Sequence, residues 1–269
     1  MKGDLLEKLK RLQNNLEKLN SVAIGYSGGV DSTFLTKIAN DVLGENAIAI
    51  TARSSIFPKK ELIEAKKYTK KIGIKHIIFD FDETKIKIFT KNPVNRCYFC
   101  KKELFTQIKH IAKENHISYV ADGSNIDDES DYRPGMKALK EIGIISPLRE
   151  VGLTKAEIKS LSKEMKIKIW DKPSNACLAS RFPYGVEISK SRLSQVEKAE
   201  IFLSSYGIPQ LRVRYHKDIA RIEVPPDCFN IIIKNSEEIN KYFKKLGFKY
   251  TTLDIKGFRT GSLNEVLQK

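Results

Sequence analysis

A pair of glycines between an apolar run and a helical pattern could bind an anion. Residues 22–26 suit a buried strand, and Ser27-Gly-Gly-Val-Asp-Ser32 follows before apolar residues resume at helical spacing. Glycines let backbone N–H groups turn toward a phosphate, and the positive end of the helix dipole adds to the attraction. The segment lacks the lysine of a Walker A loop and is not G-x-G-x-x-G. A tight turn that only connects strand to helix is the simpler alternative.

The four cysteines could hold a metal or an iron–sulfur cluster. Cys97 and Cys100 form a C-x-x-C directly before a predicted helix, whose dipole lowers thiol pKa values. Cys177 stands alone after what should be another strand end, whereas the apolar setting of Cys228 is typical of a buried thiol. Structural zinc usually takes four protein ligands, and the sequence has no second C-x-x-C to complete such a set. Zinc is therefore the less favoured alternative to an iron–sulfur cluster. Three thiolates with one open position match a [4Fe–4S] cluster.

An alternating α/β architecture would position these residues. The patterns predict strands at 22–26, 47–52, 76–80 and 118–121, and helices at 1–20, 34–43, 59–72 and 98–115. This alternation implies a parallel sheet with right-handed crossovers. Ligands of such sheets bind beyond the carboxyl ends of the strands, so the Ser27 loop and the polar stretch 122–131 should line one cleft.

A second, smaller domain is predicted toward the C-terminus. A helix at 154–165 begins with a capping box, and prolines and glycines then punctuate a polar segment. After them the patterns predict helices at 189–206 and 236–246 and strands at 210–215, 220–224 and 250–255. We therefore expect a first domain over residues 1–184 and a small α+β domain over residues 185–269.

Composition narrows the class of protein. Of 269 residues, 41% are hydrophobic and 30% are charged, which excludes a disordered or collagen-like chain. The net charge of +15 suggests an anionic partner, such as a nucleotide, a phosphorylated metabolite or RNA, although the lysines are spread over nearly every predicted helix, as on a solvated surface. The charged first twenty residues argue against a signal peptide, and no apolar run is long enough to span a membrane. We expect a cytoplasmic protein without a membrane partner.

The glycine segment resembles the PP-loop of the ATP pyrophosphatase family. The resemblance implies that the loop binds the β,γ-phosphates of ATP and releases pyrophosphate when the α-phosphate is attacked. Carried over residue by residue, it assigns the pyrophosphate to Ser27, Gly28, Gly29 and Ser32, Mg²⁺ to Asp31, and adenine and ribose to the strand end with Ala52 and Ser54. Gly123 would let the nucleotide approach the backbone. This motif alone leaves tRNA thiolation, NAD or GMP synthesis, other ligations and sulfur insertion open.

Further motifs resemble the LarE family of sulfur transferases over the whole chain. These motifs are residues 122–125, 131–135, 173–181, 211–214, 220–223 and 253–259. The resemblance implies adenylation of the carboxylates of pyridinium-3,5-biscarboxylic acid mononucleotide and their conversion to thiocarboxylates, toward the nickel-pincer cofactor of lactate racemase. In single-cysteine members the residue aligned with Cys177 surrenders its sulfur. With Cys97 and Cys100 added, this chain resembles the branch in which three cysteines hold a [4Fe–4S] cluster that carries the transferred sulfide, so that Cys177 is a ligand.

The mononucleotide substrate implied by the resemblance needs a second anion site. Arg212 and Arg214 alternate on one predicted strand and so share a face, where they could clamp a phosphate, and Arg181 could assist; surface charge is the alternative. Two acidic residues, Glu200 and Glu223, match family positions near the transfer centre that can bind metal, or are ion-pair partners. Lys101 and Arg133 could stabilise the charge that develops at phosphorus.

Two other functions stay open from the sequence. One is a PP-loop tRNA thiolation enzyme, which the charge favours, but the paired zinc-binding C-x-x-C modules and an RNA-binding appendage are absent from the sequence. The other is a non-enzymatic iron–sulfur or zinc carrier, against which the intact PP-loop argues. We expect a small-molecule substrate, a sulfide donor, no nucleic acid and a homo-oligomer.

Overall fold

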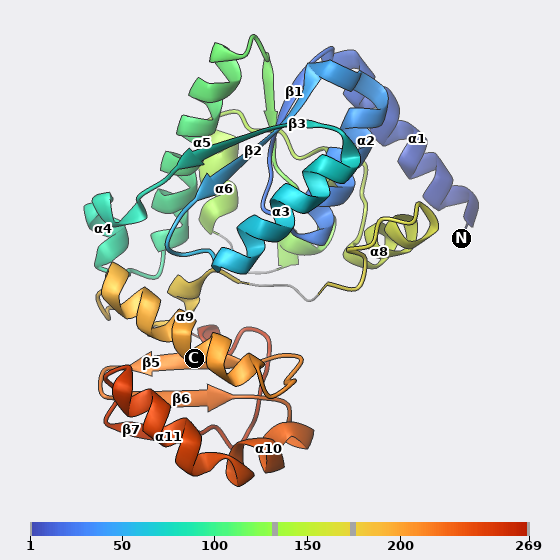
Figure 1. Cartoon of the computed structure of the whole chain (residues 1–269). Coiled ribbons are helices and arrows are strands. Elements are labelled where there is room, and N and C mark those ends of the chain that lie inside the picture. Colours follow the sequence, from blue (N-terminus) through green and yellow to red (C-terminus); the bar gives the residue numbers. More distant parts are fainter. Residues whose placement is uncertain (1, 131–133, 173–175, 268–269) are drawn as a thin grey trace. The chain divides into compact units, whose positions relative to one another are not determined.

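The computed structural model describes residues 2–130, 134–172 and 176–267 (Figure 1). The chain divides into two compact units. Unit 1 comprises Met1–Asp82 and Asn95–Asn175, and unit 2 comprises Glu83–Val94 and Ala176–Lys269. The chain therefore passes between the units three times. Unit 2 takes in the segment 83–94 and begins again at Ala176, whereas the domain boundary expected from the turn residues lies after residue 184.

Unit 1 is built on a parallel sheet. Its strands are β1 (Val22–Gly25), β2 (Ala47–Arg53), β3 (Lys75–Asp80) and β4 (Tyr119–Ala121), in the order β3-β2-β1-β4. In the register Ile24 lies opposite Ala49 on one side and Ala121 on the other. The predicted parallel α/β architecture is confirmed. Because β1 and β4 are neighbours, the loops that follow them leave the same edge of the sheet.

Helices surround this sheet. They are α1 (Lys2–Leu19), α2 (Val30–Leu43), α3 (Lys59–Ile72), α5 (Arg96–Glu114), α6 (Pro134–Glu141), α7 (Pro147–Glu150) and α8 (Lys155–Glu164). The predicted capping box is present at α8, where the Thr154 hydroxyl accepts from the Glu157 N–H and the Glu157 carboxylate accepts from the Thr154 N–H. At α2 the N-cap residue is Gly29, which has no side chain with which to cap the helix.

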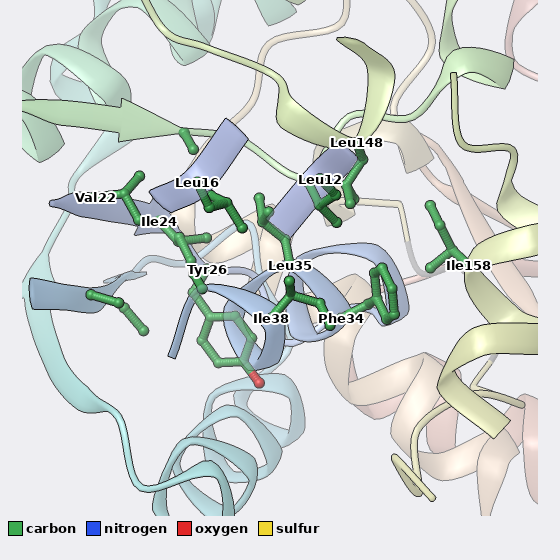
Figure 2. Close-up of a cluster of buried hydrophobic side chains, with 14 of the residues drawn as sticks. Leu12, Leu16, Val22, Ile24, Tyr26, Phe34, Leu35, Ile38, Leu148 and Ile158 are labelled. Carbon is green, nitrogen blue, oxygen red and sulfur yellow. The ribbon is translucent and has the colours of Figure 1, made fainter. Parts of the chain in front are cut away.

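Two hydrophobic clusters hold the sheet from opposite faces. The first packs side chains of α1, α2, α7 and α8 against one face of β1, as Figure 2 shows for Leu16, Ile24, Leu35, Leu148 and Ile158. The second packs α5 and α6 against the other face, where the alternate β1 residue Ala23 points. Burial on both faces explains why the strands read as continuous apolar runs. It also fixes the end of β1, from which the glycine loop continues.

Unit 2 is a small α+β fold. Its elements are α4 (Lys87–Thr90), α9 (Lys190–Ser204), β5 (Arg212–His216), β6 (Ile219–Glu223), α10 (Phe229–Lys234), α11 (Ser236–Lys245) and β7 (Tyr250–Leu253). The sheet order is β5-β6-β7, with β5 and β6 antiparallel and β6 and β7 parallel. The buried Asn92 amide donates to the carbonyls of Pro183 (2.7 Å) and Val186 (3.1 Å), which joins the segment 83–94 to this unit. Across the described ranges, no helix is long and apolar enough to cross a membrane.

Candidate active site

The glycine loop at the end of β1 has the geometry of an anion cradle. Gly28 adopts a φ of +73° and lies so close to α3 that a Cβ would come within 3.2 Å of the Ala65 Cβ. The Ser27 and Ser32 hydroxyls lie 3.1 Å apart across the loop. Since no side chain caps the start of α2, its first N–H groups can serve a bound anion. The loop therefore suits a phosphate.

Asp31 supplies the carboxylate beside this cradle. It stands in the first turn of α2, and its Oδ2 lies 3.7 Å from the Lys155 Nζ. Burial raises the pKa of Asp31, an effect that the charge of Lys155 opposes. Its Oδ1 is buried and has no hydrogen-bond partner within the described part of the chain. An unpaired, buried carboxylate oxygen next to a phosphate site fits a hard cation such as Mg²⁺.

A chain of hydrogen bonds behind the loop fixes the residue that precedes it. The Thr51 hydroxyl donates to the Tyr26 carbonyl (2.8 Å), so it must accept from the His76 Nε2, 2.8 Å away. The Nδ1 of neutral His76 is then an acceptor and lies 2.9 Å from the Thr69 hydroxyl, whose one proton also has the Ala65 carbonyl within reach at 3.0 Å. Tyr26 directly follows β1, and Thr51, His76 and Thr69 lie on β2, β3 and α3. The arrangement holds the carboxyl end of β1 in register with β2 and β3.

His76 gives this network a measurable pH dependence. Burial, with a smaller effect of the Lys66 charge, lowers the pKa of His76 to about 4. The unfolded chain therefore binds a proton at His76 before the folded chain does, so stability falls as the pH drops from about 6.5 toward 4. Urea denaturation at about pH 7 and about pH 4.5 should show a loss about 2 kcal/mol larger in the wild type than in H76Q. The variant H110Q, which alters an exposed histidine, should keep the wild-type difference; equal losses in H76Q and the wild type would contradict the argument.

The loop after β4 lies against the glycine loop, as predicted. A Cβ on Gly123 would meet the backbone of Ser32 at 2.9 Å, so the missing side chain makes room for the start of α2. Asp122 is buried and accepts from the Ser146 hydroxyl at 2.6 Å, while the Lys101 Nζ lies 3.8 Å from its Oδ2. Lys101 thus reaches the end of β4 from α5. Close packing against Ser32 therefore requires glycine at position 123, independently of any contact with the nucleotide.

The end of β2 provides the backbone proposed for adenine and ribose. Ala52 is half-buried and pairs with Phe79, and the Ser54 Oγ accepts from the Ile56 N–H at 3.2 Å. Between them the exposed Arg53 forms an ion pair with Asp80 at the end of β3. These positions lie at the carboxyl edge of the sheet, where the fold places ligands.

Cys97 and Cys100 lie near the start of α5, in unit 1. Their spacing puts them one helical turn apart; Cys97 is exposed and Cys100 is buried. Cys177 and Cys228 are half-buried residues of unit 2. Among the described residues, no group of three or more histidine, cysteine, aspartate or glutamate side chains could hold a metal ion. Arg133, expected to act with Lys101, falls outside the described residues.

Arg181 is a buried, hydrogen-bonded residue of unit 2 that contacts Glu200 and the backbone at Cys177. It is 1% exposed, and its guanidinium binds Glu200 through two hydrogen bonds of 2.9 and 3.0 Å. The same guanidinium donates to the carbonyls of Ala176 (2.9 Å) and Cys177 (3.2 Å). Arg181 therefore holds the backbone of Cys177 in place. Glu200 is its ion-pair partner and also accepts from the Val213 N–H.

The two strand arginines share one face of the unit 2 sheet, opposite Glu223 and Arg221 in the register. Arg214 donates to Glu223 (2.9 Å) and to the Ser180 carbonyl (2.6 Å), and its buried Nε has no hydrogen-bond partner among the residues described. The Arg212 guanidinium stacks over the Phe258 ring. Burial, followed by the charge of Arg181, lowers the pKa of Arg212 to about 10. The cluster is thus rich in positive charge.

Glu223 is the buried anion of this cluster. Its side chain is fully buried and accepts from Arg214, Arg221 and Ser262. The variant E223Q should lower the free energy of unfolding by about 3–5 kcal/mol, since it leaves two arginines short of their counter-charge. Chemical denaturation, with hydrogen exchange of peptides from β5 and β6, would measure the loss. The variant E265Q, which removes an exposed partner of Arg259, should leave stability unchanged. Equal effects of the two variants would contradict the argument.

Comparisons with known proteins identify the family. A model of the NAD synthase family matches residues 5–120. An uncharacterized protein of Synechocystis is 44% identical over 98% of this chain and 100% of its own length. The pyridinium-3,5-bisthiocarboxylic acid mononucleotide synthase of Lactiplantibacillus plantarum is 36% identical over 94% of this chain and 92% of its own length. The chain belongs to the family of this synthase, the LarE family.

Family membership makes the chain an ATP-dependent sulfurtransferase with a PP-loop. The expectations of a LarE family member and of a PP-loop α/β fold are confirmed. The tRNA-specific 2-thiouridylase MnmA of Rickettsia rickettsii is more distant, at 23% identity over 68% of this chain and 61% of its own length. The glycine loop described above accordingly has the place in the fold of the PP-loop of this family.

The structure adds residues that sequence reasoning missed. Lys155 and Lys172 reach the PP-loop region from segments more than 100 residues away in the chain. Ser262 likewise joins the Glu223 cluster from a distant segment, whereas Arg221 joins it from the same strand. No local pattern marks such residues, because their role depends on long-range packing. A signal was present only for Arg221, which alternates with Glu223 on a predicted strand.

Proposed function

We propose that this enzyme converts the carboxylates of pyridinium-3,5-biscarboxylic acid mononucleotide to thiocarboxylates, in synthesis of the nickel-pincer nucleotide cofactor. The observation that carries the proposal is the 36% identity to the Lactiplantibacillus plantarum synthase over nearly the whole of both chains. Identity that extends through unit 2 supports a shared substrate, because the PP-loop unit alone occurs with many chemistries.

In the first half-reaction a substrate carboxylate attacks the α-phosphorus of ATP, which forms an acyl-adenylate and releases pyrophosphate. The PP-loop with Ser27, Gly28, Gly29 and Ser32 would hold the β- and γ-phosphates through backbone N–H groups and hydroxyls. Asp31 would hold Mg²⁺, for which its unpaired oxygen is suited. Lys101 would contribute positive charge near the reacting phosphate. Ala52, Ser54 and Gly123 would border the nucleoside.

In unit 2 the arginine cluster would bind the phosphate of the substrate nucleotide. The support is the unpaired, buried Nε of Arg214 together with Arg212, whose pKa is lowered mainly by burial and then by the charge of Arg181. An incoming phosphate would supply both an acceptor and a counter-charge. Arg181 would act differently from Arg212 and Arg214, since its donors already hold Glu200 and the backbone at Cys177. Glu200 and Glu223 serve as ion-pair partners and stay candidates for metal binding.

Sulfur would come from a [4Fe–4S] cluster held by Cys97, Cys100 and Cys177. What supports this proposal is the chemistry of the thiols: Cys97 and Cys100 stand one turn apart near a helix start, and the backbone of Cys177 is held by Arg181. A cluster with three protein ligands would supply sulfur that is not the sulfur of Cys177. Such a cluster would need a sulfide donor to reload it. We also propose that the protein is cytoplasmic and forms a homo-oligomer.

The test is an anaerobic assay with ATP, Mg²⁺ and the biscarboxylate nucleotide. AMP, pyrophosphate and a thiocarboxylate product should form together, and a matched pyridinium mononucleotide without carboxylates should give none of them. If unmodified tRNA, and not the small nucleotide, triggers AMP release, the enzyme is instead a tRNA thiolation enzyme. That alternative has the weaker support, since MnmA resembles the chain at only 23% identity.

A further inference from the structure

The ammonium group of Lys172 contacts the backbone of the PP-loop at Gly28. Its Nζ donates to the Gly28 carbonyl at 3.1 Å, to Glu61 at 2.5 Å and to Glu64 at 2.7 Å. The side chains of Lys172 and Glu61 are each 14% exposed. Burial acts to lower the pKa of Lys172, but the hydrogen bonds to the two glutamates outweigh it and the pKa is raised. The three protons of the ammonium group are therefore all engaged, and the group stays charged.

The bond to Gly28 fixes the orientation of one peptide group of the loop. In a trans peptide the carbonyl of Gly28 and the N–H of Gly29 point in opposite directions. With the carbonyl held toward Lys172, the Gly29 N–H is directed to the opposite side, where the Ser27 Oγ lies 3.3 Å away. That is the side of the serine hydroxyls.

We propose that Lys172 is a positioning residue for the pyrophosphate end of ATP. It acts through the Gly28 carbonyl and holds the Gly29 N–H toward the phosphates, while Glu61 and Glu64 anchor the lysine on α3. The inference rests on ATP binding by the PP-loop and is independent of where the sulfur goes. The proposal predicts that loss of Lys172 weakens binding of the β- and γ-phosphates and leaves binding of the rest of the nucleotide unchanged.

Calorimetric titration of the full-length protein with ATP and with AMP tests this prediction. In K172M the Kd for ATP should rise by about tenfold to thirtyfold, the usual effect of losing a charge-assisted hydrogen bond, while the Kd for AMP stays within about twofold. In K172R, whose guanidinium can still donate to the Gly28 carbonyl, part of the ATP affinity should return. The matched control is K168M, which removes an exposed lysine from the same segment and should keep both wild-type values.

Two results would overturn the proposal. One is a K172M protein that binds ATP as the wild type does, and the other is an equal loss of ATP and AMP binding, which would indicate a general structural role. If K172M does not fold, K172Q is measured in its place, because its amide can still donate to Gly28 and should give an intermediate ATP affinity. Failure of the sulfur-transfer proposal would not change these results, since only nucleotide binding is read.

Discussion

Replacement of Cys97, Cys100 or Cys177 with alanine is expected to abolish repeated sulfur transfer. Anaerobically purified wild-type protein should be brown, with broad visible absorption, and each of the three variants should lose that colour together with multiple turnover. The physical reason is that removal of any one thiolate leaves too few ligands to retain a cluster. Visible spectroscopy and iron analysis, together with thiocarboxylate formation, would measure both effects.

The control for these variants is C228A, since Cys228 is a half-buried residue outside the proposed ligand set. It should keep the colour and the activity. Pyrophosphate release should persist in all four variants, because the PP-loop is untouched, and this separates loss of the sulfur source from loss of folding. A wild-type protein that is colourless and holds zinc, or a C97A variant that turns over repeatedly, would contradict the cluster proposal.

Replacement of Asp31 with asparagine is the second large effect. We expect D31N to lower the rate of pyrophosphate release by about 10²–10³-fold, because the cation that would neutralise the leaving group loses its proposed carboxylate ligand. The Mg²⁺ concentration for half-maximal rate should also rise. A coupled pyrophosphate assay across a Mg²⁺ titration would measure both quantities.

The matched control is D41N, which removes an exposed carboxylate near the other end of α2. It should leave the rate and the Mg²⁺ dependence unchanged. Wild-type rates of D31N at low Mg²⁺ would show that the unpaired oxygen of Asp31 serves the fold and does not hold the cation.

The parallel sheet of unit 1 could be predicted because its signals are local. Its strands are short apolar runs, and glycine, proline or polar residues separate them from amphipathic helices. The short helices α4, α6, α7 and α10 were missed, since four to eight residues carry too little periodicity to be recognised. The place of the segment 83–94 in unit 2 has no local signal in the sequence, because it depends on the long-range bonds of Asn92.

The candidate site likewise has features that the sequence predicts and features that it does not. The PP-loop could be predicted from its spacing, and its proximity to Gly123 followed from the rule for parallel sheets. The partners of Arg181 and Lys172 could not, because each binds side chains or carbonyls that only the folded chain brings together. Arg181 shows the consequence: it reads as a phosphate ligand in the sequence, but its donors hold Glu200 and the backbone at Cys177 in the structure.

The most direct test of the account is turnover with isotopically labelled sulfide, followed by mass spectrometry of both product and protein. With ATP and the biscarboxylate nucleotide, the account predicts labelled thiocarboxylate in excess over protein, with Cys177 keeping its own sulfur. An unlabelled product limited to the amount of protein, with Cys177 converted to dehydroalanine, would contradict it.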